Sequence, residues 1–362
     1  MQLMDLLKEM TQIPALAGHE EKMARYLAAA LAPYADEISI DKVGNLIARI
    51  DGTDPAAPKI MIFAHMDQLG FMVRKIEADG FLRLERLGGI PEKVLPGTGV
   101  WVEAEDGAVY PGVIGNKAHH MTPAEEKYAV MPYQQLYVDM GAKSDAELYD
   151  MGIDIGSPVV YQARFETLLN ERVAATSLDD RGGCAILVKL AELAAQNRPA
   201  ATLYLVGSVQ EEFNLRGACL AAAAILPDFA VSLDLMIAGD TPDLKERSDL
   251  KLGGGPILGL YSFHGRGTLN GTIPHPGLVR LIKEAAKNQN IPLQRSAAVG
   301  ILTDSAYVQL VGTGIPAIDL GFAARYTHTP VEICDRTDLL GLLSLVWSAV
   351  STIGPGFTLS RG

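Results

Sequence analysis

Residues 59–67 read KIMIFAHMD, an almost unbroken apolar run followed by a histidine and an aspartate two positions apart, His65 and Asp67. A continuous apolar run of this length is typical of a strand that is buried on both faces of a sheet. Because residues i and i+2 of a strand lie on the same face, Asp67 is placed to orient the imidazole of His65. The stretch therefore predicts a central strand with polar chemistry at its carboxyl end.

Strand-like and helix-like segments alternate around this run. Two helices joined by residues 14–18 precede it, and ATLYLVGSV (201–209) and FAVSLDL (229–235) have the composition of further buried strands. The segment DRGGCAILVKLAELAAQ (180–196) is typical of a helix. Such alternation predicts an α/β fold in which helices flank a mixed, mostly parallel sheet.

The sequence pattern changes between residues 70 and 165. Short β-rich runs such as GFMVRKIEADGFLRLERLGG (70–89) alternate there with Gly, Pro and Asp turns. A chain of 362 residues is also long enough for more than one domain. We therefore expect a catalytic domain formed by residues 1–69 and 166–362, interrupted by an inserted all-β, barrel-like domain at residues 70–165.

Composition excludes several classes of function. The net charge is −12 and no run of Lys or Arg stands out, so the surface should repel phosphate backbones and no nucleic-acid partner is expected. Three cysteines without CxxC spacing fit a reducing compartment. Because no signal peptide and no apolar run long enough to span a bilayer are recognisable, we expect a cytoplasmic protein without membrane contact.

Further acids and a second histidine follow other strand-like runs. In open α/β sheets, ligands bind at the carboxyl ends of the strands, where distant parts of the sequence converge. Two histidines with three or four acids would suit two divalent metal ions. The candidate residues are Asp179 and Asp180 in SLDDRGG, Glu211 and Glu212 in VQEEFNLRG, Asp234 in VSLDL, and His328 in RYTHTP.

Each candidate also has an ordinary structural interpretation. One aspartate of the pair Asp179–Asp180 is expected to cap the following helix while the other binds metal. One glutamate of the pair Glu211–Glu212 would bind metal while its neighbour moves a proton between water and the leaving amine. Taken singly, the glutamates could be a solvated pair and His328 an exposed turn residue. It is the combination that favours a metal centre.

With these residues in view, the chain resembles the M42 family of metallo-aminopeptidases, which includes glutamyl, deblocking and tetrahedral TET peptidases. The resemblance covers nearly the whole chain and implies a zinc-exopeptidase-like fold acting on peptide substrates. It rests on AHMDQLG, GVIGNK, SLDDRGG, VQEEFNLRGA, LDLMIAGDTP, ILTDSA and RYTHTPVEI, in that order and spacing.

The resemblance implies two metal ions, zinc, cobalt or manganese, and a ligand for each position. His65 and Asp234 would hold one ion. Glu212 and His328 would hold the other, with Asp179 bridging both. The inserted β domain would serve dimerisation, and dimers of such proteins assemble into tetrahedral dodecamers. We therefore expect a homo-oligomer, either a dimer or a dodecamer.

Further roles follow from the same resemblance. Glu211 would be the general acid/base, Asp67 would support His65, and the peptide bond Asp179–Asp180 would be cis. We add Asp304 as a candidate for holding the α-amine of the substrate. Many members have Val-Gly after the Glu pair and Thr-Asp-Ala-Gly later, where this chain has Phe213-Asn214 and TDSA (303–306). These departures leave the preferred N-terminal residue open.

Other functions remain in competition. A related two-metal hydrolase could cleave another bond, as an N-acyl amino acid deacylase or a carboxypeptidase. The fold could also serve a non-catalytic assembly protein. A glycosidase is disfavoured, because two histidines and an adjacent Glu pair suit a metal centre better than two carboxylates flanking a sugar.

Overall fold

A twelve-stranded mixed sheet forms the larger part of the molecule. The computed structural model describes residues 1–265 and 269–361. Along the sheet the strands are β1 (Glu37–Ile40), β2 (Leu46–Ile50), β12 (Thr202–Ser208), β3 (Lys59–His65), β13 (Phe229–Ile237), β17 (Ala317–Arg325), β18 (Glu332–Asp335), β11 (Arg172–Ala175) and β10 (Phe165–Thr167), while β14 (Ile257–Phe263), β15 (Gly271–Thr272) and β16 (Gln294–Val299) form a branch beside β17.

The sheet is mixed, as predicted, but it is not mostly parallel. The four neighbouring strands β12, β3, β13 and β17 are parallel, as are β14 and β16, whereas the remaining pairs are antiparallel. The outer strands β1 and β2 follow one another closely in sequence, as do β10 and β11. Such short connections can join only antiparallel neighbours, which is why the prediction failed at the edges.

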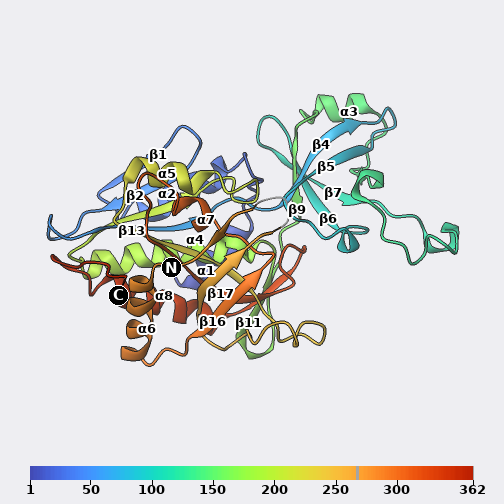
Figure 1. Ribbon diagram of the computed structural model, residues 1–362. Helices are drawn as coiled ribbons and strands as arrows, with labels where there is room; N and C mark the ends of the chain where they lie inside the picture. Colours follow the sequence, from blue (N-terminus) through green and yellow to red (C-terminus); the bar gives the residue numbers. More distant parts are fainter. Residues whose placement is uncertain (266–268, 362) are drawn as a thin grey trace.

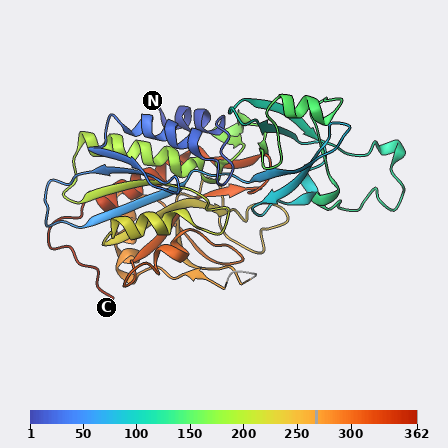
Figure 2. The same cartoon turned by 90° about the horizontal axis from the view of Figure 1, so that it is seen from above.

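Helices cover both faces of the sheet. The strand β3 is apolar throughout because its side chains are buried on both faces. Ile60 and Ile62 pack into the core on one face, with α4 and the helices around it. Met61 and Phe63 pack on the other face, towards α5. Figure 2 shows the N-terminal helices and α4 above the sheet. The helices of this part are α1 (Leu3–Thr11), α2 (Glu21–Leu31), α4 (Leu178–Gln196), α5 (Gly217–Ile225), α6 (Pro276–Asn288), α7 (Ser305–Val308) and α8 (Arg336–Val350).

Residues 70–161 form a second structural unit, which projects from one end of the sheet (Figure 1). Its six strands close into a barrel in the order β4-β5-β8-β7-β6-β9, and the segment also contains the short helix α3 (Asp145–Asp150). A separate apolar core, which includes Leu82, Val100 and Val138, fills the barrel. The strands are β4 (Gly70–Ile76), β5 (Leu82–Leu87), β6 (Gly99–Glu103), β7 (Val109–Ile114), β8 (Val138–Asp139) and β9 (Pro158–Tyr161).

Candidate metal centre

The parallel strands deliver the candidate residues to one edge of the sheet. His65 is the last residue of β3 and pairs with Ser208, the last residue of β12, so the turn that carries Glu211 and Glu212 begins beside it. Asp234 lies on β13, the strand on the other side of β3. Convergence at the carboxyl ends of parallel strands is the arrangement that the sequence predicted.

Asp179 lies between the two histidines. Its Oδ1 atom is 2.9 Å from Nε2 of His65, and its Oδ2 atom is 3.5 Å from Nε2 of His328. His65, Asp179 and Asp234 form one group whose potential ligand atoms lie within 4.8 Å of one another, and Asp179, Glu212 and His328 form a second. The five predicted metal ligands therefore come together as two triads that share Asp179.

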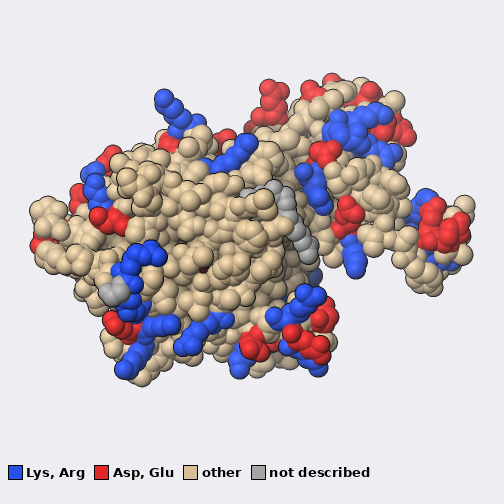
Figure 3. Space-filling view, viewed as in Figure 1, with Lys and Arg blue, Asp and Glu red and all other residues tan. Residues whose placement is uncertain are grey.

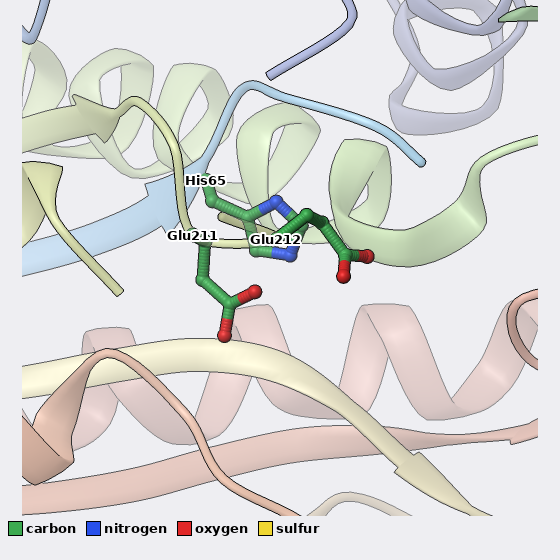
Figure 4. A group of neighbouring side chains, drawn as sticks. All are labelled: His65, Glu211 and Glu212. Atoms are coloured by element: carbon green, nitrogen blue, oxygen red, sulfur yellow. The ribbon is translucent and has the colours of Figure 1, made fainter. Parts of the chain in front are cut away.

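The adjacent glutamates point in different directions. Figure 4 shows the carboxylate of Glu211 below the His65 ring and that of Glu212 to the right of it. Glu212 belongs to the triad of His328, whereas Glu211 groups with His65 and Glu212 but not with Asp179. Positive φ angles at Gln210 and Asn214 mark the sharp turn that lets neighbouring side chains both reach the cavity. Glu212 therefore belongs to one of the two triads that share Asp179, and Glu211 lies beside them.

Asp67 is fully buried and holds the backbone of this turn. Its two carboxylate oxygens accept hydrogen bonds from the backbone N–H groups of Glu211 and Glu212, each at 3.0 Å. Nδ1 of His65 lies 3.1 Å from the backbone carbonyl of Asp67 and 3.6 Å from its carboxylate. Asp67 therefore lies beside His65, and its side chain mainly positions the Glu pair.

Glu332, for which the sequence indicated no role, has the same function on the other side of the centre. Its Oε2 atom accepts a hydrogen bond from the backbone N–H of Asp179 at 3.1 Å, and its Oε1 atom accepts one from the backbone N–H of His328 at 2.9 Å. The side chain is buried. The sequence feature that could have indicated this role is the position of Glu332 four residues after His328, in the motif RYTHTPVEI.

The two residues of the pair Asp179–Asp180 have different roles. The peptide bond between the two residues is cis, as the resemblance implied. Asp180 is fully buried and accepts a hydrogen bond from the backbone N–H of Gly183 at 2.9 Å, at the start of α4. A Cβ atom at Gly183 would lie 2.4 Å from the Asp180 carboxylate, so this helix start requires glycine. Asp180 therefore caps the helix and Asp179 faces the centre.

Asp304 and His328 each have a partner that the sequence did not reveal. Asp304 is buried, accepts a hydrogen bond from the hydroxyl of Ser208 at 2.9 Å, and is not among the residues that line the cavity. Nδ1 of His328 lies 2.8 Å from the carbonyl of Gly89, in the loop that follows β5 of the barrel. The barrel thus contributes a contact that orients a predicted metal ligand.

The charge balance of the cluster fits a cation. Burial raises the pKa of Glu212 to about 7, and burial together with neighbouring acids raises the pKa of Asp234 well above its ordinary value. Burial opposes ionisation of Asp179 as well, but hydrogen bonds from His328 and His65 hold its pKa below the ordinary value. Full ionisation of Asp179, Glu212 and Asp234 would therefore need positive charge beyond that of the two histidines, and a bound cation would supply it. Carboxylate and imidazole donors are those that zinc and related divalent ions prefer.

The centre opens into a cavity of about 490 Å³. Glu211, Glu212 and Asp234 lie along one side of it with Asp179 and His328. The rest of the wall comes mainly from two segments, the end of β13 and residues 300–303, with Tyr307 and His264.

A model of the family described as M42 glutamyl aminopeptidase matches residues 44–345. The chain belongs to this family. It is therefore a peptide hydrolase of the aminopeptidase class, which sets aside the glycosidase and non-catalytic alternatives. Among the described residues, no helix has the length and apolar character needed to cross a membrane.

Relatives in the M42 family match over nearly their full length. Lysyl aminopeptidase of Pyrococcus furiosus is 32% identical, with 97% of each chain covered. The structure of aminopeptidase APDkam598 from the archaeon Desulfurococcus kamchatkensis superposes with a TM-score of 0.92 at 32% identity, covering 98% of this chain and 96% of that one. The TET1 peptidase of Pyrococcus horikoshii, which can assemble into a tetrahedron or a large octahedral shell, gives 0.85 at 27% identity, covering 96% and 99%.

Proposed function

We propose that this chain is a metal-dependent aminopeptidase that holds two divalent ions, zinc, cobalt or manganese, at the shared cluster. The observation that carries the proposal is the position of Asp179, which offers one carboxylate oxygen to each histidine. His65 and Asp234 would complete one ligand set, and Glu212 and His328 the other. A carboxylate between two ligand sets is the arrangement that a pair of ions requires.

Glu211 would carry the proton-transfer step. Bound divalent ions would supply Lewis-acid polarisation of the scissile carbonyl and a lowered pKa for the attacking water. Glu211 would accept a proton from that water and return it to the amine of the departing peptide. Asp67 keeps Glu211 in place through the backbone. Carboxylates of the cluster would attract the protonated α-amine, and Asp304 adds negative charge close to Glu211.

The chain's assembly and location form part of the same proposal. Residues 70–165 would be an inserted domain that mediates dimerisation, and the protein would be a homo-oligomer, either a dimer or a tetrahedral dodecamer. Assembly of the TET1 relative supports this. Three free cysteines support a cytoplasmic location. On the face drawn in Figure 3, Lys and Arg lie in separate groups beside Asp and Glu, which supports the absence of nucleic-acid binding.

The experiment is metal reconstitution. Chelator-stripped protein would be supplied with Zn²⁺, Co²⁺ or Mn²⁺ and tested on a panel of aminoacyl-p-nitroanilides, N-acyl amino acids and peptides blocked at the N-terminus. Metal content would be measured by mass spectrometry. We expect about two ions per chain and turnover of free-amine substrates only. Two bound ions with turnover of N-acyl or C-terminal substrates would instead identify a deacylase or carboxypeptidase, and failure to bind any ion would refute the proposal.

A further inference from the structure

Five aliphatic residues form much of the cavity wall beyond the acidic cluster. Leu235 and Ile237 continue β13 directly from the ligand Asp234, and Ile301 and Leu302 come from the loop before α7. Leu215, which is 7% exposed, closes the wall from the turn after the Glu pair. A substrate held with its α-amine at the cluster would place its first side chain against this surface.

The same wall offers no partner for a charged side chain. Among its described residues there is no Lys or Arg, and every carboxylate belongs to the candidate metal centre. The remaining polar groups are those of Asn214, His264, Thr303, Tyr307 and Thr327. Burying an ionised side chain without a counter-charge is costly, whereas burying an apolar side chain stabilises the complex.

We propose that this cavity selects peptides whose N-terminal residue is uncharged and apolar, of the size of Leu, Ile, Met or Phe. The inference rests on the proposed aminopeptidase function and adds the substrate class to it. It differs from what the names of the relatives would suggest, since one acts on lysyl substrates and the family description names glutamyl ones.

Electrostatics explains why neither charged class fits. A glutamyl side chain would enter a cavity that already contains the carboxylates of four acids, three of them candidate metal ligands, with no Lys or Arg in the described wall. A lysyl side chain would lose its hydration against Leu235, Ile237 and Ile301, and every carboxylate of the described wall belongs to the candidate metal centre. An apolar side chain loses no hydrogen bond on entry.

The first test uses the unaltered, metal-loaded protein. Values of kcat/KM would be compared for the p-nitroanilides of Leu, Met, Phe, Ala, Lys and Glu. We expect Leu or Met to exceed Lys and Glu by about 10- to 100-fold, and Ala to fall between, because differences of one to a few methylene groups in an apolar site change selectivity by that order. A preference for Lys or Glu would overturn the inference and leave the aminopeptidase proposal intact. Turnover of none of them would instead count against the proposed function.

A second test adds a negative charge to the cavity wall and asks whether lysyl substrates are then accepted. In Ile301→Asp the new carboxylate would face the cavity, so the Lys-to-Leu ratio of kcat/KM should rise by about tenfold or more. Val299→Asp is the matched control, because Val299 is 70% exposed and does not line the cavity. Metal content of both variants would confirm an intact centre. An unchanged ratio in Ile301→Asp with full metal content would refute the assignment of this wall.

Discussion

The sheet and the barrel bury different kinds of side chain. Within residues 70–161 no charged side chain is buried, and the barrel core consists of residues such as Leu82, Val100, Val138 and Val159. At the carboxyl edge of the large sheet, by contrast, His65 and the acids Asp179, Glu211 and Asp234 are buried, and candidate ligand atoms lie within 4.8 Å of one another in each group. Buried charge is destabilising unless it is paired or binds a cation. Buried charge is therefore concentrated in the sheet unit, which contains the candidate metal centre, whereas the interior of the barrel contributes only apolar packing.

The separation is not complete, because the barrel reaches the centre at one loop. Gly89 contacts the ring of His328 through its carbonyl, and Pro91 lines the cavity. Lys22 of α2 also forms an ion pair with Glu103 of β6 at 2.9 Å. The comparison can therefore be tested by changing each unit and measuring the properties of the other.

The largest effect is expected from Glu211→Gln in the sheet unit. The amide cannot accept a proton from water, so kcat should fall by about 10²- to 10⁴-fold, the usual contribution of general acid–base catalysis. Metal content should remain at the level of the unaltered protein, since the five triad ligands are unchanged. Single-turnover kinetics and metal analysis on the same sample would check both. Retained activity would contradict the role given to Glu211.

Leu82→Ala in the barrel should affect stability instead. Leu82 is fully buried at the end of β5 away from Gly89, and a cavity of this kind typically lowers the free energy of unfolding by about 2–5 kcal/mol. Urea unfolding would measure the loss, and competition with a chelator would measure metal affinity in the folded protein. We expect metal affinity to be unchanged. A parallel loss of both would show that the two units do not act separately.

Glu332→Gln should weaken metal binding without removing a ligand. One end of the amide becomes a donor and would face the backbone N–H of Asp179 or of His328, so one of the two segments loses its support. Loss of such a supporting group typically lowers metal affinity by about 10- to 100-fold. Isothermal titration would compare the metal affinity of this variant with that of Glu166→Gln, which alters only an exposed ion pair with Arg164. Equal affinities in the two variants would remove Glu332 from the site.

The smallest effect is expected where the barrel meets the centre, in Gly89→Ala. The added Cβ atom would lie 3.2 Å from Nδ1 of His328, so the ring must shift by a few tenths of an ångström. Metal affinity should fall by about tenfold or less, because the carbonyl contact is displaced rather than lost. Gly354→Ala is the control, since a Cβ atom there meets no neighbour within 4 Å. An unaffected affinity would confine the metal centre to the sheet unit.

Local sequence patterns were sufficient to predict individual strands and several site residues of this molecule. The run at 59–67 identified a buried strand, because its two alternating sets of side chains, such as Ile60 with Ile62 and Met61 with Phe63, enter two different cores. The same run identified His65 at the strand end. Periodicity is a property of neighbouring residues, and it does not depend on how the rest of the chain folds. The parallel order of the outer strands was misjudged, because pairing at sheet edges depends on which distant strand is adjacent.

The metal centre itself is a product of tertiary structure. His65 and Asp179 are 114 residues apart in sequence and 2.9 Å apart in space, and Glu332 reaches Asp179 across 153 residues. No local pattern specifies which glutamate of the pair faces His328, that a barrel loop orients that histidine, or that the cavity wall is apolar. Short segments of the chain determine side-chain chemistry, individual strands and helix starts. Distances between those segments exist only once the sheet has assembled, because they are set by strand register and packing.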